Sequence, residues 1–380
     1  MPEVSGTASI AAIYVDAYRQ AGLSDGETIK AAFAAASAAG PSEVIFSDRN
    51  YIISEEIKVP SGVCLVGNGA TLKWPPTGAH HTFFDLTGSS NVTISKLDFI
   101  GGSRNEPAPV LWHSIVMNNS HNITVEDCSF TDVKAISIIG SSDVTINRNI
   151  ITGGVEGIIV GKLQPDDVVA LSRNINITNN TVVGQAREAI DLNSDVSEVL
   201  IKGNYFGGRT SASTATSDEI IDVGGGYIAH VTIINNKIDG ANSVAYGIRL
   251  KENVQDVVIA ENEIVDMYAG AGAAIITAAA KNVEVRGNLI NGAYNGIEVI
   301  GLATAIFTDN QFSNVALKAY KSDYGGGTLQ VLNTAETLLS PMPLRLQGSR
   351  ASDVLQGAGS DDSLEGGDGN DTLDGGAHND

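Results

Sequence analysis

The chain has 380 residues, of which 43% are hydrophobic and 18% are charged, and this composition excludes a disordered protein. Its 44 Asp and Glu outnumber its 23 Lys and Arg, and the formal net charge of −21 disfavours binding to nucleic acid or to an anionic membrane. A polyanionic partner would therefore need local compensation, either from a metal ion or from a basic patch.

The N-terminal region indicates a cap rather than a targeting segment. The first residues, MPEVSGTASIAAIYVDAYRQ, lack the basic stretch and apolar core of a signal peptide. The segment DGETIKAAFAAASAAG, residues 25–40, has apolar residues at helical spacing and a closing glycine, which predicts a helix. We expect residues 1–45 to cap the open end of a repetitive fold.

One sequence pattern repeats from about residue 91 to residue 328: a β-rich segment, an Asn-rich turn and a second β-rich segment. Examples are HNITVEDCSF, RNINITNNTV and AHVTIINNKI, and the period is about 22 to 31 residues. Val, Ile and Thr alternate as they do in strands. The sequence therefore predicts an all-β fold, a right-handed parallel β-helix over residues 1–345. The turn asparagines suit a left-handed backbone and can also form a ladder from coil to coil.

The tail over residues 346–380 has a nine-residue period. It reads GSRASDVLQ, GAGSDDSLE, GGDGNDTLD and GGAHND, and the third copy matches the calcium-binding nonapeptide in full. The tail resembles RTX modules, which implies structural Ca²⁺ and the start of a β-roll. Because the fourth copy is cut short, we expect a piece of a longer protein, and export by type I machinery would account for the missing signal peptide. The aspartates in the ligand position are Asp353, Asp362, Asp371 and Asp380.

Aligning the second segments of successive coils, from HSIVMNN to YGIRLKE, produces columns of residues that should stack. Column A runs through His113, Lys134, Glu156, Glu188, Glu219 and Tyr246. Column B runs through Val116, Ser137, Ile159, Asp191, Asp222 and Arg249. Column C runs through Asn118, Ile139, Gly161, Asn193, Gly224 and Lys251.

Acidic residues gather on three successive coils of these columns, with Asp218 as a further member, and Arg249 and Lys251 follow on the next coil. Strands about 4.8 Å apart bring Glu188 and Glu219 close enough to repel unless a cation lies between them. Strict alternation would point column A into the core, so we expect the chain to turn at the small residue that follows. The columns then predict a functional face.

A solvated acidic stripe is the alternative reading, and the scarcity of acids in the same columns of later coils argues against it. His113, Trp112, Lys134 and Tyr246 are candidates for substrate contact, although a packing role explains the histidine and the aromatic residues equally well.

The repeated core resembles the pectate-lyase-like superfamily of polysaccharide enzymes. SDEIIDV followed by YGIRLKE is similar to the chondroitinase B and alginate lyase family, which implies Glu219 as a calcium ligand and Arg249 as a catalytic arginine. The family's lysine base falls on Gly224, so Lys251 is the candidate base. Calcium held by Glu188, Glu219 and Glu156 would neutralise a uronate carboxylate.

Two further resemblances point to other reactions on the same face. Polygalacturonases hydrolyse with acids on successive coils, which implies catalytic Glu188, Asp218 and Glu219 and sugar binding by Arg249 and Lys251. Secreted mannuronan C5-epimerases also join a β-helix to RTX modules; of their D-P-H signature only Asp191 occupies the matching place, and Asn193 stands where histidine is expected. Asp222 lies in column B with Asp191 and is a further candidate catalytic residue.

We therefore expect a secreted enzyme that acts on an acidic polysaccharide. β-Elimination is the favoured reaction, with hydrolysis and epimerisation as alternatives, and a non-enzymatic polysaccharide-binding β-helix also remains open. A monomer with no nucleic-acid or membrane partner is expected.

Overall fold

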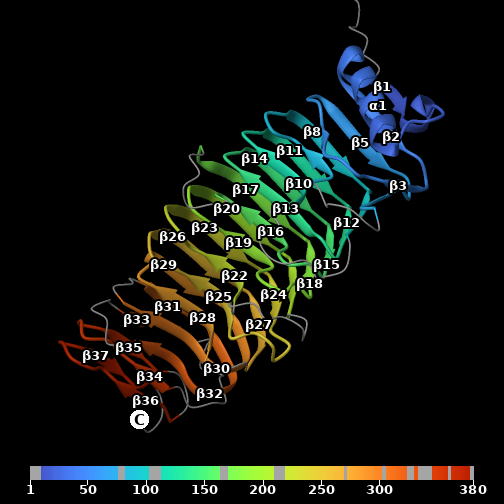
Figure 1. Cartoon of the computed structure of the whole chain (residues 1–380). Coiled ribbons are helices and arrows are strands. Elements are labelled where there is room, and N and C mark those ends of the chain that lie inside the picture. The colour runs from blue at the N-terminus through green and yellow to red at the C-terminus, as the bar shows by residue number, and fades with distance from the viewer. Residues whose placement is uncertain are drawn as a thin grey trace, which may run out of the picture.

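The computed structural model describes residues 10–75, 82–101, 113–162, 170–208, 219–268, 272–301, 305–322, 329–332, 345–357 and 361–376. They form a right-handed parallel β-helix, an elongated coil with the helical segment at one end and the C-terminus at the other (Figure 1). A complete coil contributes one strand to each of three parallel stacks, named stacks 1, 2 and 3 in the order in which the chain visits them. The predicted fold class is confirmed.

Stack 1 is one continuous 15-stranded parallel sheet. Its strands are β1 (Ala11–Tyr14), β2 (Ser42–Phe46), β5 (Val63–Gly67), β8 (Ser90–Ser95), β11 (His121–Glu126), β14 (Ser142–Asn147), β17 (Ser172–Thr178), β20 (Val196–Lys202), β23 (Ile228–Ile234), β26 (Val254–Ala260), β29 (Lys281–Arg286), β31 (Ala305–Thr308), β33 (Leu329–Leu332), β35 (Val354–Gln356) and β37 (Thr372–Asp374).

Stacks 2 and 3 join into a 22-stranded sheet because the long strands β30 (Leu289–Ile300) and β32 (Gln311–Ser322) run through both. Stack 2 otherwise contains β3 (Asn50–Ile52), β6 (Thr71–Lys73), β9 (Asp98–Ile100), β12 (Ser129–Thr131), β15 (Ile150–Thr152), β18 (Thr181–Val183), β21 (Tyr205–Gly207), β24 (Lys237–Asp239) and β27 (Glu263–Met267). Stack 3 otherwise contains β4 (Ile57–Lys58), β7 (Phe84–Asp85), β10 (His113–Asn118), β13 (Lys134–Ile139), β16 (Ile158–Val160), β19 (Ile190–Leu192), β22 (Glu219–Val223), β25 (Tyr246–Leu250), β28 (Ala273–Ala278), β34 (Arg345–Gln347) and β36 (Ser363–Glu365).

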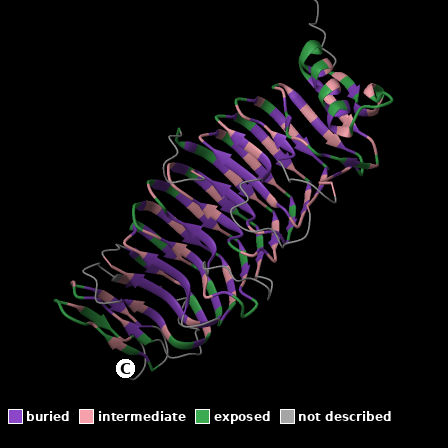
Figure 2. Ribbon diagram, viewed as in Figure 1, coloured by how far each residue is buried: buried purple, intermediate pink, exposed green. Residues whose placement is uncertain are grey.

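The interior is a stack of branched aliphatic side chains, which suit the pleated surface of a strand. In stack 3 Ile190 pairs with Ile221, and Ile221 pairs with Ile248, so the same side chain recurs one strand further along. Figure 2 shows this buried interior along the whole length of the coil. Because identical positions stack, a residue at one point of the repeat always meets its counterpart in the next coil.

A ladder of buried asparagines lies at the turn between stacks 1 and 2. From Asn180 onward, each member accepts, on its Oδ1, hydrogen bonds from the backbone N–H and the Nδ2 of the preceding asparagine, whereas Asn149 accepts from the Cys128 N–H. Each member also donates from Nδ2 to an earlier carbonyl. For Asn204 the bonds from Asn180 are 2.8 and 3.0 Å, and its own bond to the Ile177 carbonyl is 2.9 Å. The ladder runs through Asn149, Asn180, Asn204, Asn236, Asn262, Asn288 and Asn310.

The left-handed backbone conformation at this turn belongs to the residue before each ladder asparagine. Arg148 has φ 54°, Asn179 has φ 55° and Glu261 has φ 54°. The sequence interpretation, in which one residue would supply both the left-handed backbone and the ladder side chain, is therefore wrong. Two adjacent residues divide these tasks, because the left-handed residue points its side chain outward while the next one points inward.

The N-terminal cap consists of the 3₁₀-helix η1 (Val15–Tyr18) and helix α1 (Asp25–Ala39). The Ser24 hydroxyl accepts from the Glu27 N–H, and the Glu27 carboxylate accepts from the Ser24 N–H, which together form a capping box. Phe33 of α1 packs on Phe84 of β7, with ring centroids 6.1 Å apart. The helix therefore covers apolar side chains that the first coils would otherwise expose.

The RTX-like tail continues the sheets of the β-helix. Strands β35 and β37 extend stack 1 beyond β33, and β34 and β36 extend stack 3 beyond β32. Lys321 pairs with Gln347, and Gln347 pairs with Glu365. The tail therefore covers the C-terminal end of the coil.

We expect Asn204→Ala to lower the free energy of unfolding by about 2 to 3 kcal/mol, because it leaves the buried Asn180 N–H groups and the Ile177 carbonyl unpaired. The control is Asn291→Ala, which removes an exposed amide that accepts from Asn314. The midpoint of urea denaturation should change little for this control. Equal midpoint shifts for the two variants would contradict a stabilising role for the ladder.

Candidate active site

The register of stack 3 confirms the alignment of the columns. Column B is continuous: Ile159 pairs with Asp191, Asp191 with Asp222, and Asp222 with Arg249. In column A, His113 pairs with Lys134, and Glu219 pairs with Tyr246. The predicted acids therefore lie on adjacent strands of one face.

Along each aligned segment of stack 3, two residues separate the column A position from the column B position, and both of them face inward. Columns A and B therefore both face outward. The first of the two is usually small, and a Cβ on Gly157 would collide with the Ala189 carbonyl oxygen of the next coil. The second is the core isoleucine, such as Ile158. Strict alternation fails at this position, so the side chain of Glu219 reaches Arg249 of column B.

The face has buried carboxylates beneath half-exposed cations. The side chains of Glu156, Glu188 and Glu219 are only 4%, 3% and 2% exposed. The side chains of Arg187 and Arg249 are 44% and 36% exposed. The outermost charges are therefore positive, in a protein whose net charge is −21.

The N-terminal half of this cluster centres on Glu156. Lys134 Nζ lies 2.9 Å from one of its oxygens, and Arg187 forms an ion pair with the other. Arg187 Nε also lies 3.5 Å from Glu188 Oε2. Arg187 was missed in the alignment because it precedes Glu188 and falls outside the columns; its position beside a candidate acid was the available signal.

The C-terminal half consists of two ion pairs between neighbouring coils. Arg249 donates to Glu219, and Lys251 donates to Asp222. The Lys251 side chain passes over Gly224, where an added Cβ would lie 2.5 Å from the Lys251 Cβ. Lys251 therefore fills the space that a side chain at position 224 would occupy.

Asp191 lies at the centre of the cluster. Burial, followed by the negative charges of Glu188, Asp222 and Glu156, raises its pKa to about 8, although Arg187 opposes the shift. The pKa of Asp222 is also raised, by burial and by the charges of Glu219 and Glu188, although the hydrogen bond from Lys251 opposes the shift. Asp191 keeps part of its surface exposed. At neutral pH it is therefore a protonated carboxylic acid within reach of a ligand.

The remaining predicted residues are more dispersed. His113 is 1% exposed and lies beneath the surface, so its side chain is not placed to contact a substrate as predicted. Tyr246 is partly exposed, and the Arg249 guanidinium lies 5.7 Å from its ring centroid. Trp112, Asp218 and Asp380 lie outside the described residues. Glu298 occupies column B on β30, so acids extend further along this face than the alignment indicated.

Calcium binding by Glu156, Glu188 and Glu219 stays a prediction. Within the ranges that the structure describes, neither this face nor the tail has a group of three or more His, Cys, Asp or Glu side chains arranged to hold a metal ion. Arg187, Arg249 and Lys134 supply the positive charge that calcium was expected to supply. The residues as arranged do not fit a calcium cage on this face.

The tail fits its predicted calcium sites better. Each of the first three repeats begins with a glycine whose Cα faces the aspartate of the same repeat: a Cβ on Gly357 would lie 2.5 Å from Asp362 Oδ2. Asp353 and Asp362 are both buried. The Asp353 N–H donates to Asp371 Oδ1 over 3.0 Å, which links the first repeat to the third. Asp353 and Asp371, which precede the stack 1 strands β35 and β37, would bind calcium at one turn, and Asp362, which precedes β36 of stack 3, would bind it at the opposite turn, with turn carbonyls as further oxygen ligands.

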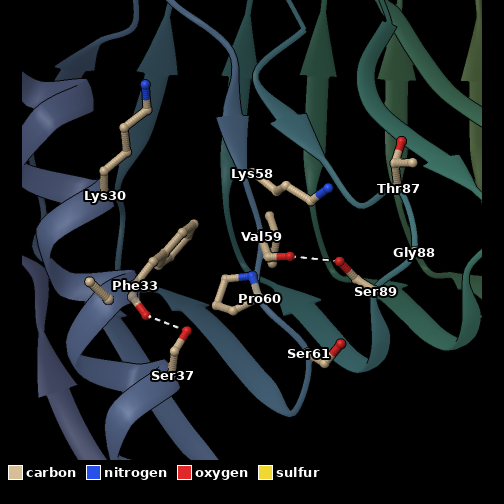
Figure 3. A pocket seen from close by; sticks show the side chains of 11 residues that line it. Lys30, Phe33, Ser37, Lys58, Val59, Pro60, Ser61, Thr87, Gly88 and Ser89 are labelled. Atoms are coloured by element: carbon tan, nitrogen blue, oxygen red, sulfur yellow. Dashed lines mark hydrogen bonds between the residues drawn. The ribbon is translucent and has the colours of Figure 1, made fainter.

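Two hollows lie away from the acidic face. One lies between α1 and the first coils and is lined by Lys30, Phe33 and Pro60 (Figure 3). Hydrogen bonds within its wall pair the Ser89 hydroxyl with the Val59 carbonyl at 2.6 Å. The other lies on stack 1 around Glu284 and Ile306. The lining of neither hollow combines buried acids with cations as the acidic face does.

Comparisons with protein families agree with this architecture. The family described as "Right handed beta helix region" matches residues 165–312, and "Periplasmic copper-binding protein (NosD)" matches residues 42–219. "RTX calcium-binding nonapeptide repeat (4 copies)" matches residues 347–380. No curated protein sequence matches the chain. The protein is thus similar to β-helix proteins with a C-terminal RTX segment.

Solved structures with a similar fold include both enzymes and an adhesin. PfbA, a surface adhesin of Streptococcus pneumoniae, has a TM-score of 0.63 at 18% identity and covers 82% of this chain and 93% of its own. An exopolygalacturonase from Thermotoga maritima has a TM-score of 0.60 at 12% identity, with 86% and 93% covered. An alginate lyase from Paenibacillus sp. has a TM-score of 0.56 at 16% identity, with 85% and 99% covered. These identities establish the fold alone.

The helices in the described part of the chain include none long and apolar enough to cross a membrane.

The raised pKa of Asp191 makes stability depend on pH. Between about pH 4 and pH 8 the folded chain keeps a proton that the unfolded chain has lost, so the free energy of unfolding falls as pH rises through this range. The Asp191→Asn variant should not show this fall in the free energy of unfolding. We expect the variant to exceed the wild type by at least about 1.4 kcal/mol at pH 8, equivalent to one pKa unit, and to match it near pH 4.

Urea denaturation at the two pH values measures this difference. The control is Asp143→Asn: the pKa of Asp143 is lowered by hydrogen bonds from Asn174 and Ser142, so its substitution should produce no gain at pH 8. A wild type as stable as Asp191→Asn at pH 8 would contradict burial of a protonated Asp191.

Calcium should stabilise the whole β-helix, because the RTX strands continue its stacks. At a calcium concentration about a hundredfold above the dissociation constant, one occupied site would add about 2.7 kcal/mol to the free energy of unfolding. Thermal unfolding in calcium and in EDTA tests this, with magnesium as a comparison. The double variant Asp362→Asn, Asp371→Asn should lose the shift, whereas Asp374→Asn should keep it. Identical melting temperatures in calcium and EDTA would contradict the role of the tail.

Proposed function

We propose that the outer face of stack 3 is the active site of an exported enzyme that cleaves an acidic polysaccharide. The observation that carries this proposal is the arrangement of exposed cations above buried carboxylates, with a protonated Asp191 among them. Arg187 and Arg249 are available to bind a sugar carboxylate. In a protein with a net charge of −21, this face supplies the local compensation that such a substrate needs.

Hydrolysis is the reaction that these protonation states support best. Glycoside hydrolysis commonly uses one carboxylic acid and one carboxylate. Asp191 donates its proton to the glycosidic oxygen as the bond to the sugar carbon breaks. Asp222, which accepts a hydrogen bond from Lys251, would accept a proton from the attacking water.

β-Elimination is the second candidate, and it is favoured by the position of Lys251 over Gly224. Gly224 falls where the resemblance to the chondroitinase B and alginate lyase family places a lysine base. Lys251 would first pass its proton to Asp222 and then remove the C5 proton of a uronate. The electron pair would form the C4–C5 double bond, and Asp191 would protonate the departing oxygen. The ion pair between Lys251 and Asp222 makes the free amine costly, so hydrolysis ranks first.

A panel of alginate, pectate, glycosaminoglycans and neutral glycans tests the proposal. We expect new reducing ends with an acidic glycan and no ultraviolet absorbance from unsaturated uronates. Appearance of that absorbance would select elimination, and altered uronate stereochemistry without cleavage would select epimerisation. Binding of a glycan without any product would place the protein among the non-enzymatic β-helices.

Asp191→Asn should lower the rate on a confirmed substrate at least about a hundredfold, because it removes the proton donor. The wild-type rate should also fall above about pH 8, as Asp191 ionises. The matched control is Asp195→Asn, which removes a carboxylate that pairs with Lys162 at 2.8 Å, outside the cluster. Full activity of Asp191→Asn would refute the proposed mechanism.

A further inference from the structure

A second group of polar residues lies on the same outward columns, closer to the C-terminus. Column B continues from Arg249 to Ile276, and Ile276 pairs with Glu298 on β30. Glu298 pairs in turn with Lys321 on β32. Neighbouring strands are about 4.8 Å apart, so Lys321 lies three strands, or about 14 Å, beyond Arg249.

This group repeats the charge arrangement of the candidate active site. Lys321 donates to Glu298, and their side chains are 35% and 9% exposed. Glu219 and Arg249 show the same order, with a buried carboxylate beneath a half-exposed cation. In column A, Lys318 follows Asn295 and donates to Gln347 of the next coil. Two ammonium groups therefore meet the outer surface within one coil.

Asn295 provides an independent sign that this group binds something. The residue is 2% exposed, and its Oδ1 has no hydrogen-bond partner. A buried amide oxygen without a partner is costly unless a ligand or water donates to it. Asn295 is the column A neighbour of Lys318, so this buried oxygen belongs to the strand next to the one that carries the ammonium. A sugar hydroxyl is the kind of donor that such an oxygen accepts.

We infer that Lys318, Lys321 and Asn295 form a second subsite, which binds another acidic sugar of the same polysaccharide. This inference rests on the proposed function, because it places the glycan along the axis of the coil, with one carboxylate at Arg249 and another at the two lysines. Ile276 and Ala273 separate the two charged groups, so the two cationic groups lie about three strands apart along the coil. The enzyme therefore prefers long acidic chains to short ones.

Binding of oligosaccharides of different length tests this inference without relying on turnover. Pectate- and alginate-derived octasaccharides and disaccharides are titrated calorimetrically into the Asp191→Asn protein, alone and combined with lysine substitutions. Lys318→Ala should weaken octasaccharide binding about tenfold, the typical effect of losing one hydrogen bond to a charged group. Disaccharide binding should not change. Lys281→Ala, which removes an exposed lysine of stack 1, is the matched control and should alter neither affinity.

Lys321→Ala alone would leave Glu298 buried without its partner. The test therefore uses the double variant Glu298→Gln, Lys321→Met, which removes both charges. It should also weaken only the octasaccharide. Equal loss for both lengths, or no loss for either, would overturn the second subsite. Full turnover by Asp191→Asn alone, with the length dependence intact, would overturn the proposed mechanism but not the subsite. Absence of octasaccharide binding to the unsubstituted protein would overturn both.

Discussion

The asparagine ladder fixes the register from which the other features of this protein follow. Each buried amide bonds to the backbone N–H and the amide of its neighbour, so a slip of one residue in any coil would break hydrogen bonds on both sides. Buried polar groups that lose their partners cost about 1 to 3 kcal/mol each. The ladder thus holds the coils from Asn149 to Asn310 in alignment, and residues at the same point of the repeat meet on neighbouring strands there.

That alignment creates the chemical problem that the outer face of stack 3 resolves. Stacked acids on adjacent strands repel each other, and burial strengthens the repulsion because water no longer screens it. The chain compensates in two ways. Arg187, Arg249 and Lys251 neutralise most of the carboxylates, and Asp191 keeps its proton. Both the cationic surface and the proton donor result from this compensation.

The same stacking determines how the tail can act on the rest of the molecule. Strands β34 to β37 pair in register with the coils before them, so the RTX-like repeats and the outward columns of stack 3 belong to the same sheets. Gln347 illustrates the connection: it lies at the start of the tail and accepts from Lys318 of the second polar group. Order in the tail and order at this end of the face are therefore physically linked.

The sequence by itself determined the fold class, the capping helix and the vertical alignment of the acids, because a period-two pattern repeated at one-coil spacing leaves little freedom in where residues stack. The columns from Glu156 to Arg249 could be derived for that reason. Sequence could not decide which carboxylates pair with cations and which keep a proton, since Arg187 enters from outside the repeat and Lys251 crosses over Gly224. Nor did the alignment reach Glu298 and Lys321, although the segments YNGIEVI and LKAYKS continue the same columns. Only the tertiary structure places these side chains, because their charges depend on burial and on neighbours from other coils.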